Sequence, residues 1–268
     1  MKLCLLLALN FALSCTQGPK LKQHSELELT DYVMKESLLA NAVNSASVAA
    51  PNCIQPFEAN IPKPVYNRLT QMMGQNFNQD DLYKSIRSRI IAGTDKEKLL
   101  GLAEQLNGET WKKFLSSIPK SEDNKKFTKI FHALDEGTFD LKSRRSQLVA
   151  QITDHAFMLN LVKVSNSQVM KMMPEDINRP KTRKQKSVME WIARELETFN
   201  DAHIKALYAN TYLTTEKMTE AELEELLRIR SHDVLRLGKH ALEEELQLRY
   251  QKFFKQMVEF RDGGSAPI

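Results

Sequence analysis

Helical periodicity is the feature that most constrains what this chain can fold into. Glycine and proline number only nine each among 268 residues, and most of them stand where apolar residues stop recurring at three- and four-residue spacing. Both residue types disfavour helix interiors, so their placement marks the ends of helices. No segment carries the alternation or turn signals of strands and hairpins. The sequence therefore predicts an all-α fold of about eight to ten helices.

The periodic segments divide into two related helical halves joined by a long helix. We expect a tether at 15–26, an N-terminal half at 27–136, the long connecting helix at 137–178, a C-terminal half at 179–262 and a frayed tail at 263–268. Within the N-terminal half, 27–49 is predicted as one helix that begins near Thr30-Asp31. Further helices are expected at 65–77, 80–92, 94–106, 109–118 and 127–134.

Two similar helix starts, one in each half, are the basis for predicting that the halves are related. Thr94-x-x-Glu97 and Thr219-x-x-Glu222 are capping boxes, in which the threonine hydroxyl and the glutamate carboxylate each satisfy a free amide. Each follows a Leu-Tyr pair, Leu82-Tyr83 and Leu207-Tyr208. The pattern resembles a small all-helical domain of unknown function that occurs, often in tandem, in bacterial exported proteins. The turns after these helices, Asn107-Gly108-Glu109 and Arg230-Ser231-His232-Asp233, depart from that family's pattern. The resemblance implies a fold but no functional residue.

The connecting helix contains a coiled-coil-like seam. From Leu141 it alternates steps of four and three residues over about four heptads, through the positions Arg145, Leu148, Ile152, His155, Leu159, Val162, Asn166, Val169 and Met173. One interpretation is self-association or helix pairing through 148–173, with Asn166 fixing the register. The other is an ordinary core helix in which His155 and Asn166 form local hydrogen bonds. Arg145 would place a charge in the first heptad, so a dry interface could begin only near Leu148.

The N-terminus carries an export signal. Lys2 precedes a mostly apolar run of about 11 residues, too short to span a bilayer. The run ends in Ala12-Leu13-Ser14-Cys15, which resembles the lipobox of bacterial lipoproteins, although that family prefers Leu at the place of Ala12. The resemblance implies a signal peptide at 1–14 and acyl chains on Cys15 as the membrane anchor. Thr16, instead of the aspartate typical of inner-membrane retention, favours the outer membrane. The alternative is a soluble periplasmic or secreted product.

The two other cysteines follow from that assignment. Cys4 leaves with the signal, so the mature chain keeps Cys15 and Cys53. If Cys15 is lipidated, Cys53 is a lone thiol in an oxidising compartment. If Cys15 is not lipidated, the two could form a disulfide and close an N-terminal loop. The turn-rich setting of Cys53, with no histidine within a few residues, gives no support for a catalytic thiol.

A basic run marks the start of the C-terminal half. Its five cations are Arg179, Lys181, Arg183, Lys184 and Lys186. Such a run can bind the acidic groups of an envelope polymer or a lipid head group, or it can be a solvated helix start. No aromatic side chain interleaves it, and export argues against nucleic acid as a partner. The formal charge of +4 is small beside the 72 charged residues of both signs.

Recognisable catalytic motifs are lacking. The zinc helix, the nucleophile elbow and the phosphate loop are all missing from the sequence. His232, Asp233, Arg236 and His240 fall near one side of the last helix if it begins around Asp233, but a central arginine disfavours a cation site. We expect acidic residues such as 243–245 to lie on solvated helix faces. There they would form ion pairs with cations four residues later, Glu224 with Arg228 and Glu245 with Arg249.

We therefore expect no cofactor and no metal, and a protein that acts by binding instead of catalysis. The predicted function is a lipid-anchored helical envelope protein that serves as a protein-interaction or structural module. An acidic-surface binder through the basic run is one alternative, and an enzyme of unrecognised type with a dispersed site is another.

Overall fold

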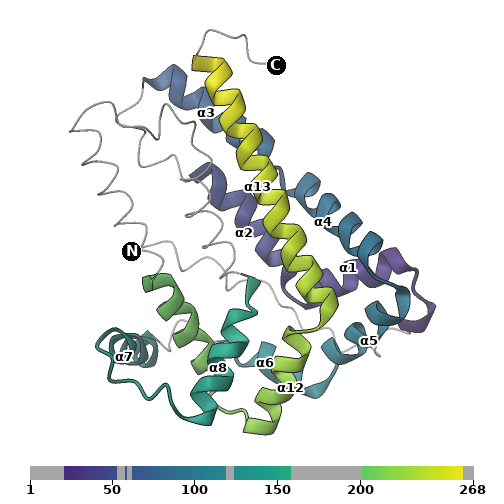
Figure 1. Cartoon of the computed structure of the whole chain (residues 1–268), viewed down its shortest axis with the longest axis vertical. Helices are drawn as coiled ribbons and strands as arrows, with labels where there is room; N and C mark the ends of the chain where they lie inside the picture. The colour runs from purple at the N-terminus through teal and green to yellow at the C-terminus, as the bar shows by residue number, and fades with distance from the viewer. Residues whose placement is uncertain (1–20, 53–57, 59–61, 119–123, 158–200, 262–268) are drawn as a thin grey trace.

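The computed structural model describes residues 21–52, 58, 62–118, 124–157 and 201–261. Every regular element in these residues is a helix, which confirms the all-α class (Figure 1). In chain order the elements are η1 (Leu21–Gln23), α1 (Glu26–Glu36), α2 (Leu39–Asn52), α3 (Lys63–Asn76), α4 (Gln79–Gly93), α5 (Lys96–Leu106), α6 (Glu109–Ser116), α7 (Asn124–Asp135), α8 (Arg144–Asp154), α12 (Glu220–Arg230) and α13 (Asp233–Arg261). Residues 201–214 are also helical.

The C-terminal helix α13 connects the two ends of the described fold. It is 29 residues long and packs along α4, α3 and α2, as Figure 1 shows from its start beside α12 to its end beside α3. Elsewhere α1 packs against α5, and α12 packs against α8. The last helix of the sequence thus packs mainly on helices of the N-terminal half. All the described buried apolar side chains except Ala209 and Leu213 form one continuous core.

Two glycines allow α13 and α4 to approach closely. A Cβ atom on Gly238 of α13 would lie 2.7 Å from Cδ2 of Leu39 and 3.3 Å from Cδ1 of Ile90. A Cβ atom on Gly93, the last residue of α4, would lie 2.7 Å from Cδ2 of Leu237. Real Cβ contacts are not as short as 2.7 Å. The close approach of the two helices therefore depends on the absence of side chains at Gly238 and Gly93.

The single helix predicted over 27–49 is wrong, because the structure has two helices there. Ser37 ends α1, and Leu38 takes a left-handed backbone conformation with φ of 69° before α2 begins. Helix α1 also begins earlier than expected. The Ser25 side chain accepts a hydrogen bond from the Glu28 amide, and Glu28 caps the Ser25 amide in return. Thr30 lies inside the helix instead and donates to the Glu26 carbonyl.

The long connecting helix is also interrupted. Helix α8 begins after its N-cap Ser143, later than the expected start near 137, and ends at Asp154 with His155 as its C-cap. The seam therefore does not continue as one helix through His155. Its later positions, from Leu159 to Met173 with Asn166 among them, lie outside the described residues.

Polar contacts join α8 to α12 and to the segment before α12. The Arg145 guanidinium donates to the Met218 carbonyl at 2.8 Å and also to the Thr215 carbonyl, so this seam arginine binds backbone carbonyls just after the 201–214 helix. Cations are favourable at such helix ends. Glu224 of α12 pairs with Arg144 of α8 at 2.8 Å, and the predicted pair of Glu224 with Arg228 is replaced by this interhelical contact.

The two predicted capping boxes differ in outcome. Thr219 caps α12 with Glu222, which confirms the second box. At the first, Asp95 is the N-cap of α5 and accepts from the Lys98 amide at 2.8 Å, whereas Thr94 ends α4. Aspartate is as good an N-cap as threonine and stands one residue nearer the helix, so it takes the cap.

Helices α5 and α12 match once they are aligned on their true N-caps. Both contain 11 residues. Leu99 and Leu102 of α5 then correspond to two buried leucines of α12, Leu223 and Leu226. The last position differs, because the buried Leu106 of α5 corresponds to the final arginine of α12.

Candidate functional site

Several residues singled out in the sequence lie outside the described part of the chain. They are Cys15, Cys53 and the five cations of the basic run, Arg179, Lys181, Arg183, Lys184 and Lys186. The structure therefore leaves the lipid anchor and the acidic-surface site as predictions. Within the described residues, no helix combines the length and apolarity needed to cross a bilayer.

The polar residues at the start of α13 do not converge on one point. His232 accepts a hydrogen bond from the Val234 amide through Nδ1, at 3.3 Å. Asp233 forms an ion pair with Arg236, and His240 lies 2.9 Å from a Glu244 carboxylate oxygen. Among the described residues, no group of three His, Cys, Asp or Glu side chains could hold a metal ion. These residues cap and brace the helix.

The acidic stretch 243–245 is not simply a solvated face. The Glu245 side chain is only 11% exposed and lies 3.5 Å from the Arg249 guanidinium, which confirms the predicted pair. It also pairs with Arg89 of α4 at 3.1 Å, and Arg89 contacts the more exposed Glu244 as well. These ion pairs join α13 to α4.

A more distinctive cation lies at the end of α12. The Arg230 guanidinium carbon stands 4.9 Å from the ring centre of Phe114 and 5.6 Å from that of Trp111. Both rings belong to α6, are buried and lie 5.3 Å apart. A cation over an aromatic face is attracted by the ring quadrupole. Helix α6 thus supplies the aromatic wall for a cation at the end of α12.

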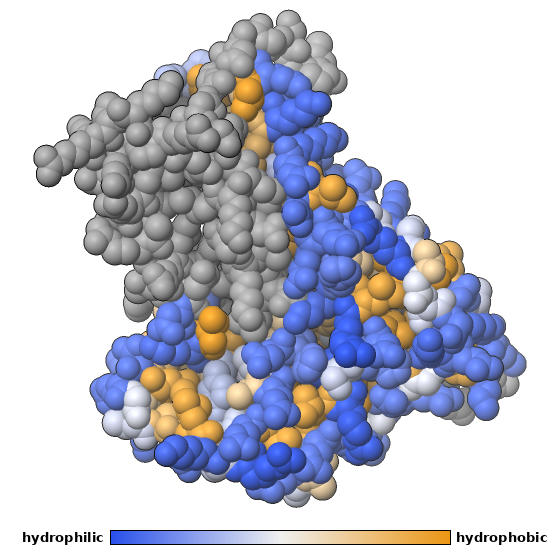
Figure 2. All heavy atoms as spheres, in the orientation of Figure 1, coloured by the Kyte–Doolittle hydropathy of each residue, from blue (hydrophilic) through white to orange (hydrophobic). Residues whose placement is uncertain are grey.

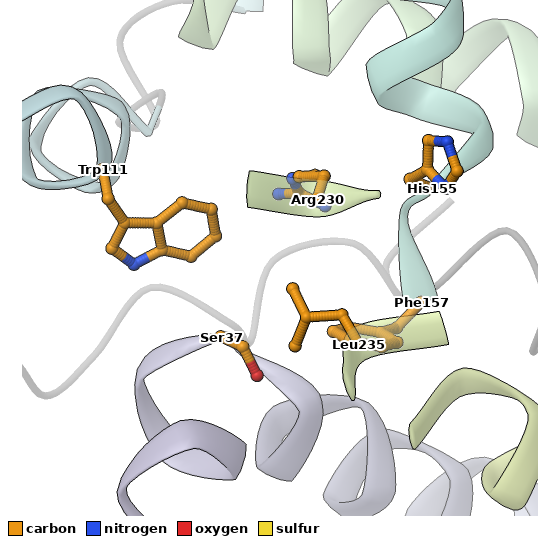
Figure 3. Close-up of a pocket in the computed structure, with 6 residues that line it drawn as sticks. All are labelled: Ser37, Trp111, His155, Phe157, Arg230 and Leu235. Carbon is orange, nitrogen blue, oxygen red and sulfur yellow. The ribbon is translucent and has the colours of Figure 1, made fainter. Parts of the chain in front are cut away.

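Six residues from separate elements line a small pocket around this arginine: Ser37, Trp111, His155, Phe157, Arg230 and Leu235. Figure 3 shows Arg230 between Trp111 and His155, with Ser37 and Leu235 below it in this view. The space is narrow, and no water-sized sphere fits between the side chains.

Two polar atoms in the pocket lack partners. Nε of Arg230 and Oγ of Ser37 are buried, and neither has a hydrogen-bond partner in the structure. Among the described residues, no carboxylate forms an ion pair with Arg230. Burial lowers the pKa of Arg230 to about 10, so the side chain remains a cation at neutral pH. Unsatisfied buried donors cost free energy, which makes this pocket the strongest candidate for a binding site.

The charge around the pocket is positive. Burial lowers the pKa of His155, and the nearby cations Lys239, Arg236 and Arg230 lower it further. Only Asp154 acts in the opposite direction. A partly enclosed space lined by one sign of charge concentrates counter-ions, so the pocket is suited to an anion.

Sequence reasoning placed Arg230 in a turn and missed the pocket. The available signal was its register, because Arg230 occupies the position where α5 has the buried Leu106. The neighbours of that position, from α1, α6 and α8, could not be read from the sequence. Comparisons of the chain with protein-family models, curated proteins and solved structures found no match.

Proposed function

We propose that this chain is a lipid-anchored helical protein of a bacterial envelope, and that it acts as a protein-interaction or structural module. The lipobox-like residues Ala12-Leu13-Ser14-Cys15 supply the anchor. Two or three acyl chains on one cysteine hold a protein stably at a membrane, where one chain would bind only marginally. The resemblance to lipoproteins favours the outer membrane.

The observation that carries this proposal is the short distance between the anchor and the folded body. Leu21 is buried and η1 packs against α5, and Leu21 follows Cys15 by six residues. Six residues span at most roughly 20 Å. An acylated Cys15 therefore keeps Leu21, and with it the helical body, within about 20 Å of the bilayer surface.

Such an arrangement suits a protein that meets its partner at the membrane. The surface of α13 seen in Figure 2 is mainly hydrophilic, with small separate apolar areas beside it. A partner that binds such a surface would make mostly polar contacts with it. We propose a protein partner in the same envelope layer.

Mass spectrometry of the mature N-terminus tests the anchor. We expect a chain that begins at Cys15 and carries diacylglycerol with an additional acyl group, and loss of this mass in Cys15→Ser. An unmodified Cys15, or a cut at another position, would contradict the anchor.

Cross-linking in intact cells tests the interaction. We expect discrete adducts with a membrane-associated protein in the wild type, and their loss or weakening in Cys15→Ser expressed at the same level. If the wild type forms only the adducts that the unanchored variant also forms, the proposed role of the membrane tether is wrong.

A further inference from the structure

We propose that the pocket around Arg230 is a binding site for a small organic carboxylate, with Arg230 as the residue that binds the anion. A guanidinium whose Nε is buried without a partner retains unused donor capacity. The Arg230 side chain as a whole is only partly buried, but its Nε is enclosed and unpaired, and a bound anion would satisfy this donor. No described carboxylate of the chain supplies a counter-charge.

The aromatic wall holds the cation that would bind the ligand. The guanidinium carbon of Arg230 lies over the rings of Phe114 and Trp111, 4.9 and 5.6 Å from their centres. The N–H groups of a guanidinium point outward in its own plane, so they remain free to bind a ligand at the edge. Carboxylates match this edge with two parallel hydrogen bonds. The aromatic contacts therefore hold the cation in place, and its N–H edge is the part that a carboxylate would bind.

The rest of the lining adds a donor and a positive field. Ser37 contributes a buried hydroxyl without a partner. His155 borders the pocket and lies within the influence of Lys239, Arg236 and Arg230. These groups come from different parts of the chain, α1, the end of α8, α12 and α13, so the pocket is formed only in the folded protein.

The size of the pocket restricts the ligand. Because no water-sized sphere fits between the side chains, a ligand enters only if the lining opens, and a single carboxylate needs the smallest movement. Phe157 and His155 form the side of the pocket that lies beyond the last residue of α8. Movement of these two side chains would leave α6 and α12 in place.

A helix of this length and register can also end in an apolar residue. Helix α5 has the buried Leu106 at the matching position. Arg230, in contrast, is only partly buried and forms no ion pair with a described carboxylate. The aromatic contacts stabilise Arg230 in place, and a ligand would use the donor that these contacts leave free.

Fluorescence of Trp111 provides a direct test, because the chain has only two tryptophans. We would use the full mature chain with Cys15→Ser and Trp191→Phe, so that lipidation plays no part and Trp111 alone emits. Titration with acetate or succinate against chloride, at constant ionic strength, should change the emission with a saturable curve. Inorganic phosphate is the comparison anion and should bind more weakly.

Arg230→Met is the decisive variant, and Arg228→Met is its matched control. Both remove one cation from α12, but Arg228 is exposed and does not line the pocket. We expect Arg230→Met to fold and to weaken acetate binding at least about tenfold, while Arg228→Met binds as the parent does. Ser37→Ala removes only the unpartnered hydroxyl, so it should fold and weaken binding less.

Three results would overturn the proposal. The first is a parent protein whose Trp111 emission gives no saturable response to either carboxylate. The second is equal loss of binding in Arg228→Met and Arg230→Met, which would indicate a general charge effect. The third is a large drop in Tm for Arg230→Met, with Ser37→Ala binding acetate as the parent does, which would make the arginine a structural residue.

Discussion

Trp111 donates a 3.1 Å hydrogen bond from its indole Nε1 to the carbonyl oxygen of Glu36. Since Glu36 is the last residue of α1, this bond fastens α6 to the end of α1 just before the chain turns at Leu38. The same indole ring supports the Arg230 guanidinium. One side chain therefore links the helix junction to the pocket.

Trp111→Phe should destabilise the protein by about 1–3 kcal/mol, because it removes the hydrogen bond to the partly buried end of α1 and reduces packing. Urea unfolding followed by circular dichroism measures the change. Lys112→Ala, at an exposed neighbour on the same helix, should stay within about 0.5 kcal/mol of the parent. Equal effects of the two substitutions would show that Trp111 has no special role.

Gly238 and Gly74 should respond oppositely to alanine. A Cβ atom at Gly238 would meet Leu39 at 2.7 Å, whereas one at Gly74 of α3 meets nothing within 4 Å. Gly74→Ala should stabilise by about 0.5–1 kcal/mol through helix propensity. Gly238→Ala should instead destabilise by about 1 kcal/mol or more, because overpacking outweighs that gain. Chemical denaturation measures the free energy of unfolding of both variants. If both substitutions stabilised the protein, the crossing of α13 and α4 would have to adjust freely.

Sequence patterns predicted helices well where the cap and the periodicity agreed. Thr219 with Glu222 located the start of α12, and the expected start of α13 near Asp233 is correct. The patterns failed where the backbone departed from a helix without glycine or proline. At Leu38 the chain takes φ of 69°, a conformation that leucine rarely adopts and that the sequence does not mark. At His155 the helical spacing of the sequence continues, although α8 has already ended at Asp154.

The pocket could be predicted only in part. Trp111 and Phe114 are recognisable as core residues by their spacing, but Arg230 looked like a turn residue. Its stacking on these rings depends on how α12 packs against α6, and single-sequence periodicity carries no information about that packing. The same reason explains why Glu224 pairs across helices with Arg144.

Glu245 should contribute more to stability than its neighbour Glu244. The Glu245 side chain is 11% exposed between Arg89 and Arg249, whereas Glu244 is 43% exposed. Glu245→Gln should cost about 1–3 kcal/mol, because it weakens contacts to two guanidinium groups that remain partly buried. Glu244→Gln should cost less than about 1 kcal/mol. Thermal unfolding of both variants at one ionic strength compares them, and equal losses would contradict the difference in burial.

Acidification below pH 6.5 should destabilise the protein through two histidines beside the pocket. Burial lowers the pKa of both His155 and His232 from the ordinary value of 6.5. Nearby cations lower them further, and one adjacent aspartate opposes this in each case. The groups are Lys239, Arg236, Arg230 and Asp154 around His155, and Arg236, Lys98 and Asp233 around His232.

The direction of the pH effect follows from proton binding. Because each folded-state pKa is lower than the unfolded one, the unfolded chain binds more protons just below pH 6.5. Stability is therefore fully present above pH 6.5 and decreases as the pH falls toward the lowered values. Thermal unfolding between pH 8 and pH 5 measures this slope. His155→Gln and His232→Gln should each flatten it, whereas His132→Gln, at an exposed position of α7, should leave it unchanged. A slope that is the same in all three variants would assign the acid sensitivity to other groups.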